Sequence, residues 1–156
     1  MGEVHYLNDE LDFGVLPPEI DMLLKRGAMA HPRQPDLAEA DFLAALEQMP
    51  SALPAYRCLV KHYNRMRRFD EAYAMVVRWI AEAARQANLD DDWRQWQTAP
   101  FAALSPLKAY AFIQLRRGES AVAAEAVSHL MRLDPSDGLG GSVVAALLTG
   151  QLDVGD

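Results

Sequence analysis

The chain has 156 residues, the size of one domain and enough to bury a core or to stack a few helical hairpins. Its 22 acidic residues outnumber 15 basic ones, and the net charge of -7 opposes binding to nucleic acid or to an anionic membrane. The single cysteine, Cys58, excludes an internal disulfide and a multi-cysteine metal centre. Because the sequence also shows no signal peptide and no membrane-spanning run, we expect a cytoplasmic protein.

The chain begins with an acidic arm, predicted over residues 1–15. Six acids precede the first base, Lys25; they are Glu3, Asp9, Glu10, Asp12, Glu19 and Asp21. We expect a solvated tail, because acidic terminal segments without apolar periodicity rarely pack. A pair of catalytic carboxylates within this set is the alternative.

Alanine-rich segments with helical periodicity follow from Pro17 to Leu148, and no stretch alternates polar and apolar residues as a strand pair would. The predicted class is therefore all-α. Prolines mark where helices begin and end, at Pro17-Pro18, His31–Pro35, Met49-Pro50 and Asp134-Pro135.

The apolar spacing repeats along the chain with large and small residues in the same order. The clearest copy covers residues 53–85, with Phe69-Asp70-Glu71 expected at the turn; a second covers 104–135 and departs only at Gln114, where an aromatic residue is usual. A third covers 18–50. The recurring positions are, in the first copy, Tyr56, Leu59, Val60, Tyr63, Ala72, Val76 and Trp79; in the second, Leu107, Tyr110, Ala111, Gly118, Ala123, Val127 and Leu130; and in the third, Ala38, Phe42, Ala45 and Pro50. This spacing is typical of the tetratricopeptide (TPR) helical hairpin.

The repeats predict one TPR-like domain over residues 16–150. About three hairpins would stack into a short right-handed superhelix, closed by a capping helix at 138–149 and interrupted by an insertion at 86–103. Small residues such as Ala72 and Ala123 would lie where helices cross closely. An ordinary α-helical bundle with chance spacing is the alternative.

Motifs of catalysis are missing from the sequence. It has no glycine-rich phosphate loop, nucleophile elbow or zinc-binding His-Glu-x-x-His helix, and its four histidines are far apart. We therefore expect a non-enzymatic protein without catalytic residues, metal or cofactor. Cys58, beside Arg57 and near Lys61, suggests a thiol-based redox sensor as an alternative, against a role as a partly buried filler.

A basic segment interrupts this acidic chain. Residues 53–85 carry seven bases and three acids, a local charge of +4. In a TPR stack the first helix of each hairpin lines the concave face, which predicts a basic groove for an acidic protein partner, formed by Arg57, Lys61, Asn64, Arg65, Lys108, Phe112 and Arg116. A solvated face that offsets the acidic arm is the other interpretation.

The insertion holds two of the three tryptophans beside three consecutive acids, Asp90 to Asp92. Tryptophan and arginine are enriched in interface hot spots, so Trp93, Arg94 and Trp96 could contact a partner. They could equally fill the gap that an insertion opens between hairpins. The sequence favours neither interpretation.

Four segments resemble the nitrogenase-associated factor T family of small TPR proteins. They are LPPE at Leu16–Glu19, the pair Asp92-Trp93, LKAYAFIQLRRGE at Leu107–Glu119 and LDPSDGLGGSV at Leu133–Val143. The resemblance implies a bacterial accessory protein that binds the molybdenum–iron component of nitrogenase for maturation, protection or stabilisation of an inactive state. A TPR chaperone or adaptor for another client, such as a secretion-system protein, is the alternative.

Overall fold

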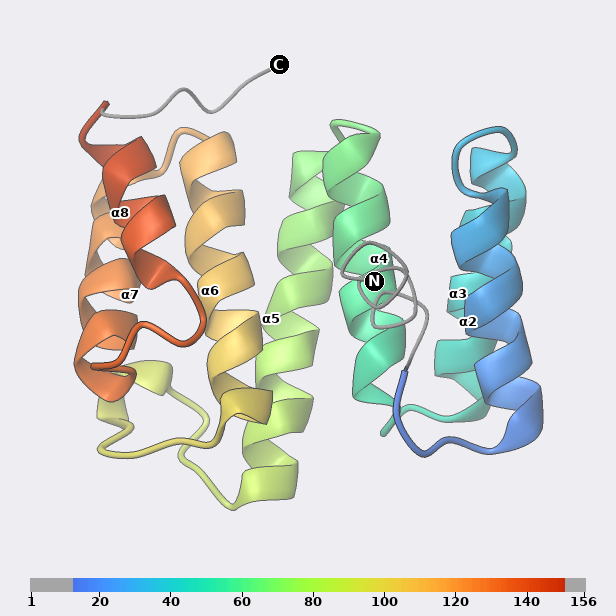
Figure 1. The fold of residues 1–156 in the computed structure, drawn as a ribbon, viewed down its shortest axis with the longest axis horizontal. Helices are drawn as coiled ribbons and strands as arrows, with labels where there is room; N and C mark the ends of the chain where they lie inside the picture. Colours follow the sequence, from blue (N-terminus) through green and yellow to red (C-terminus); the bar gives the residue numbers. More distant parts are fainter. Residues whose placement is uncertain (1–12, 151–156) are drawn as a thin grey trace, which may run out of the picture. The chain divides into compact units, whose positions relative to one another are not determined.

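The computed structural model describes residues 13–150, and every regular element in that range is a helix (Figure 1). The prediction of an all-α fold is confirmed for this part of the chain, whereas residues 1–12 of the predicted acidic arm lie outside it. In chain order the elements are α2 (Pro18–Ala30), α3 (Pro35–Gln48), α4 (Leu53–Arg65), α5 (Phe69–Ala87), the short 3-10 helix η1 (Trp93–Gln95), α6 (Phe101–Arg116), α7 (Ser120–Leu133) and α8 (Gly141–Leu148).

Helices begin and end close to the predicted breaks, because the signals there are local. Prolines occupy the first helical turns of α2 and α3, where a missing backbone N–H costs nothing. The turn predicted at Phe69-Asp70-Glu71 is wrong, since α5 begins at Phe69. Asp70 and Glu71 instead lie in the first turn of that helix, where their carboxylates face the positive end of the helix dipole.

Contacts within the chain divide it into two compact units, Met1–His62 and Tyr63–Asp156. In the first unit α2 packs against α3. The two helices approach closely at Gly27, where an added Cβ would lie 2.6 Å from Cε1 of the buried Phe42 ring. A glycine is therefore required at this crossing.

One ion pair joins the same two helices. Asp41 on α3 is only 3% exposed, and its two carboxylate oxygens accept hydrogen bonds from Arg26 Nε at 2.8 Å and Arg26 Nη2 at 2.6 Å. The paired geometry raises the pKa of the Arg26 guanidinium above its ordinary value, chiefly through the hydrogen bond to Asp41. A buried carboxylate is tolerated at this place because it is paired in full.

In the second unit α5 packs against α6, α6 against α7, and α8 against both α6 and α7. Alanines occupy the close positions, with Ala72, Ala111 and Ala123 fully buried. Gln114 stands at the position where the repeat pattern expects an aromatic residue. It is 4% exposed and satisfied: its Nε2 donates to Tyr110 Oη at 3.2 Å, and its Oε1 accepts from Arg117 Nη1 at 2.7 Å.

Between residues 13 and 150, none of the helices combines the length and the apolar character needed to cross a membrane.

Replacement Gly27→Ala is expected to destabilise the protein. Alanine adds helix propensity worth about 1 kcal/mol, but overpacking against a buried ring costs about 1–3 kcal/mol. Phe42 is packed and cannot withdraw as the end of a flexible side chain could. Urea denaturation followed by circular dichroism should show a lower midpoint with an unchanged slope.

The control is the double variant Gly27→Ala with Phe42→Leu. A smaller side chain at 42 should make the alanine much less costly, so that the two effects are not additive. Purely additive effects would mean that the ring does not restrict position 27.

Candidate functional site

The turn between α4 and α5 is held in a conformation that favours glycine. Arg67 has φ +59°, Arg67 N–H donates to Asn64 O at 3.0 Å, and Arg68 N–H donates to Tyr63 O at 2.8 Å. These are the two hydrogen bonds of a Schellman helix end, whose left-handed residue is usually glycine.

The turn between α6 and α7 has the same geometry with the usual residue. Gly118 has φ +82°, and the matching bonds run from Gly118 N to Leu115 O at 3.0 Å and from Glu119 N to Gln114 O at 2.8 Å. An L-residue in the left-handed region costs roughly 1–2 kcal/mol. Arginine at position 67 is thus the less stable choice for the backbone, and such outliers concentrate at functional sites.

The side chain at this strained position joins a cluster of arginines and aromatic rings. The Arg67 guanidinium lies over the Phe69 ring, 5.5 Å from its centroid. Arg116, at the end of α6, lies 4.7 Å from the same ring and 5.9 Å from the Phe112 ring. We call Arg67, Phe69, Phe112 and Arg116 the arginine–aromatic cluster; it brings the first residues of α5 to the last turn of α6.

Two neighbouring arginines are already committed to carboxylates. Arg68 donates to both Glu71 oxygens at 2.6 Å, and Arg117 Nε donates to Asp70 Oδ1 at 3.0 Å. Arg65 and Arg67 form no ion pair with any residue between 13 and 150. Their positive charges are therefore available to an anionic group from outside the chain.

The structure unites two of the residues predicted to line a basic groove, Phe112 and Arg116. Arg57 and Lys61 are exposed on the part of α4 in the first unit, whereas Asn64 and Arg65 end that helix in the second. Lys108 is half-buried, one turn before Phe112 on α6. The complete groove stays a prediction. Sequence reasoning missed Phe69 because it was assigned to the turn, although an aromatic residue directly after Arg67-Arg68 was a visible signal.

Both tryptophans of the insertion are buried within the chain. Trp96 is 1% exposed and its Nε1–H donates to Asp90 O at 2.8 Å. Trp93 is 5% exposed and packs against Tyr110 and His129, with ring centroids 5.8 and 5.7 Å away. These rings fill the space beside α6 and α7, which fits the second of the two interpretations of the insertion.

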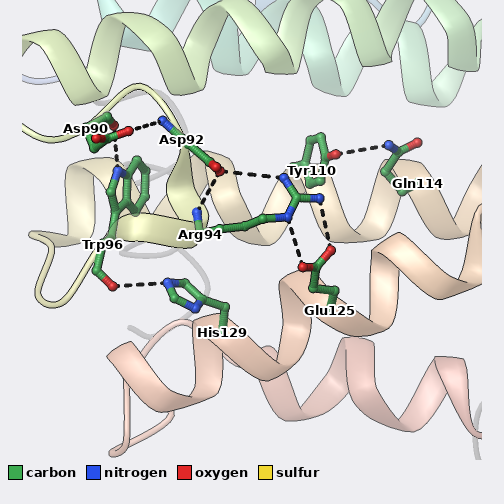
Figure 2. A network of polar contacts seen from close by, with 8 residues as sticks. All are labelled: Asp90, Asp92, Arg94, Trp96, Tyr110, Gln114, Glu125 and His129. Carbon is green, nitrogen blue, oxygen red and sulfur yellow. Dashed lines mark hydrogen bonds and ion pairs between the residues drawn. The ribbon is translucent and has the colours of Figure 1, made fainter.

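Arg94 is the exposed member of the predicted contact loop, and it is fixed to α7 (Figure 2). Its Nε and Nη2 each donate to a Glu125 oxygen at 2.9 Å, and its guanidinium lies 4.3 Å from the Trp93 ring centroid. The hydrogen bond lowers the pKa of Glu125 and raises that of Arg94. Asp92 Oδ1 accepts from the Arg94 backbone N–H at 2.9 Å and caps η1.

His129 joins the insertion to α7 as a neutral side chain. Its Nε2 lies 3.1 Å from Trp96 O, and its Nδ1 faces Arg132 Nη2 (Figure 2 shows the first contact). Nε2 must carry the hydrogen to donate to a carbonyl, which leaves Nδ1 as the acceptor. Burial, then the positive charge of Arg132, lowers the pKa of His129 below 6.5.

Between residues 13 and 150, no three His, Cys, Asp or Glu side chains are grouped so that they could hold a metal ion. Cys58 is partly exposed on α4.

A scan against protein-family models, a search of curated proteins and a search of solved structures each gave no match. The resemblance to the nitrogenase-associated factor T family therefore rests on the four sequence segments alone.

Variant His129→Gln is expected to be less sensitive to acid than the wild-type protein. Because folding lowers the pKa of His129, the unfolded chain binds a proton more readily, and the stability due to neutral His129 is lost as pH falls below about 6.5. Glutamine can still donate to Trp96 O but does not titrate. Unfolding free energies from pH 8 to pH 5 should diverge below pH 6.5; parallel curves would contradict the neutral assignment.

Variant Arg67→Gly is expected to stabilise the protein, by about 0.5–1 kcal/mol, because glycine adopts φ +59° without strain. Thermal unfolding measures this. The matched control is Gly118→Ala at the equivalent turn, which should destabilise by about 1 kcal/mol through backbone strain alone, since no atom lies within 4 Å of the added Cβ. A less stable Arg67→Gly protein would show that the arginine side chain supports the fold.

Proposed function

We propose that this protein is a non-enzymatic accessory factor that binds a protein partner, and that the arginine–aromatic cluster takes an acidic segment of that partner. The observation that carries the proposal is Arg67: its backbone is strained, its guanidinium rests on Phe69, and it has no carboxylate partner among the described residues. A structural role alone would favour glycine there.

The chemistry of the cluster suits carboxylates. A guanidinium presents its N–H groups in a planar fork that matches two carboxylate oxygens. Stacking on an aromatic ring holds the side chain in place before the partner arrives, so less conformational entropy is lost on binding. Two arginines share Phe69, which makes the cluster a fixed pair of cationic groups on an otherwise acidic protein.

The arrangement of the helices as repeats is also proposed. We infer that α2 with α3, α4 with α5, and α6 with α7 are three TPR-like hairpins of a right-handed superhelix, with α8 as the capping helix. In support, the helix bounds fall as three pairs with short turns, and the small residues of the pattern, Ala72 and Ala123, are fully buried. A cytoplasmic location is part of the proposal and is supported by the single cysteine, which suits a reducing compartment.

The client is proposed from the sequence resemblance. It is the molybdenum–iron component of nitrogenase, bound during maturation, for protection or in an inactive state. A client from a secretion system is the alternative within the same binding chemistry. The structure offers no observation that favours a redox role for Cys58.

The proposal is tested by anaerobic affinity purification of the tagged protein from its own cells, grown with and without fixed nitrogen. We expect the molybdenum–iron subunits only under nitrogen-fixing growth, in amounts that fall as salt is raised from 50 to 300 mM, because exposed charge pairs are screened. Arg67→Gly with Arg116→Gln should lower the affinity for the recovered partner roughly tenfold, if each exposed pair contributes up to about 1 kcal/mol.

The control variant is Arg33→Gln, an exposed arginine in the turn between α2 and α3. It removes one positive charge without touching the cluster and should bind as the wild-type protein does. Equal losses in both variants would indicate a general charge effect, and full binding by the cluster variant would refute the site.

A further inference from the structure

A second feature of the same unit is a pocket between α5, α6 and the insertion. Its volume is about 260 Å³, and it is lined by Tyr73, Val77, Ile80 and Ala81 of α5, Asp91 to Arg94 of the insertion, and Tyr110 of α6. The bonds that hold the insertion to α7 fix one of its walls (Figure 2).

The pocket is lined by apolar and aromatic side chains together with two carboxylates. Val77 is 41% exposed. The centroid of the Tyr110 ring lies 6.2 Å from that of Tyr73 and 5.8 Å from that of Trp93. Asp91 lines the pocket as an exposed carboxylate and forms no ion pair with the described residues.

The only cation that lines the pocket among these residues is already neutralised. Arg94 is bound by Glu125 and lies close to Asp92 as well, with 3.6 Å between Arg94 Nη1 and Asp92 Oδ1. Because Glu125 neutralises Arg94, the lining carboxylates of Asp91 and Asp92 leave an excess of negative charge at the pocket. A lysine or arginine side chain suits such a place, since its methylenes pack on apolar groups while its charged end stays at the rim.

One stripe of α5 connects this pocket to the arginine–aromatic cluster. Phe69, Tyr73, Val77 and Ala81 are spaced four apart, so each is a neighbour of the next in a row that turns by about 120° around the helix. Phe69 belongs to the cluster and the other three line the pocket. The first and last are twelve residues apart, which is about 18 Å along a helix.

We infer that the pocket takes a lysine or arginine side chain of the same partner segment whose acidic end binds the cluster. The inference rests on the proposed function and narrows it: the recognised segment carries an acidic end and a basic group about 6 to 18 Å further along. Opposite charges at the two ends of one site also fix the direction in which the segment lies, because the reversed orientation would place like charges together.

The experiment uses two labelled peptides and fluorescence anisotropy at 50 mM salt. The first has four glutamates, ten alternating Gly and Ser residues, and two lysines; such a linker spans on average about 16–19 Å. The second has glutamines in place of the lysines. We expect the first peptide to bind more tightly, because both ends engage the full-length protein.

The decisive variants are Asp91→Asn and its control Glu47→Gln, an exposed acid on α3. Asp91→Asn should weaken binding of the lysine peptide roughly two- to fivefold, as expected for one exposed ion pair, and leave the glutamine peptide unchanged. Asp91→Lys should reverse the preference. Glu47→Gln should change neither peptide.

The outcomes separate the two proposals. If Arg67→Gly with Arg116→Gln weakens both peptides while Asp91→Asn changes neither, the cluster stands and the inference about the pocket is overturned. Equal affinity of the two peptides for the wild-type protein overturns it too. If the cluster variant binds both peptides normally, the proposed function itself fails.

Discussion

In the second unit the side chain of Arg117 links the start of α5 to the end of α6. It donates to Asp70 at 3.0 Å and to Gln114 at 2.7 Å, and it lies over the Tyr73 ring at 4.1 Å. Exposed ion pairs are individually weak, but here one guanidinium joins three partners, one of which is buried. The contact touches both features of this unit, because Asp70 directly follows Phe69 of the arginine–aromatic cluster and Tyr73 lines the pocket.

Positive and negative charges are separated within the second unit, although the chain as a whole is acidic. Arg65 and Arg67, which form no ion pair with the described residues, lie at the turn before α5, and the acids of the insertion follow the other end of that helix. Arg68, Arg94 and Arg117, which lie near these two groups of charges, are already bound to carboxylates of the same chain. Such separation of charge gives an oriented surface rather than a uniformly charged one, which is more useful for specificity than for affinity alone.

The sequence predicted helices well and side-chain pairing poorly, for a physical reason. Helix ends depend on residues close by in the sequence, so prolines and apolar spacing located α2, α3 and α7 within a few residues. The turn before α5 was misplaced because its left-handed residue is Arg67 rather than glycine. Contacts such as Arg94 with Glu125 or His129 with Trp96 join residues more than thirty apart, and no periodicity reports which side chains meet across that distance.

Because the tryptophans of the insertion are buried, tryptophan fluorescence reports on the folding of the second unit. All three tryptophans, Trp79, Trp93 and Trp96, belong to the second unit and are nearly inaccessible to water. Indole emission therefore follows the environment of that unit alone, whereas circular dichroism records helices of both. If the two signals change at different denaturant concentrations, the units unfold in separate steps; if they coincide, the chain behaves as one cooperative body.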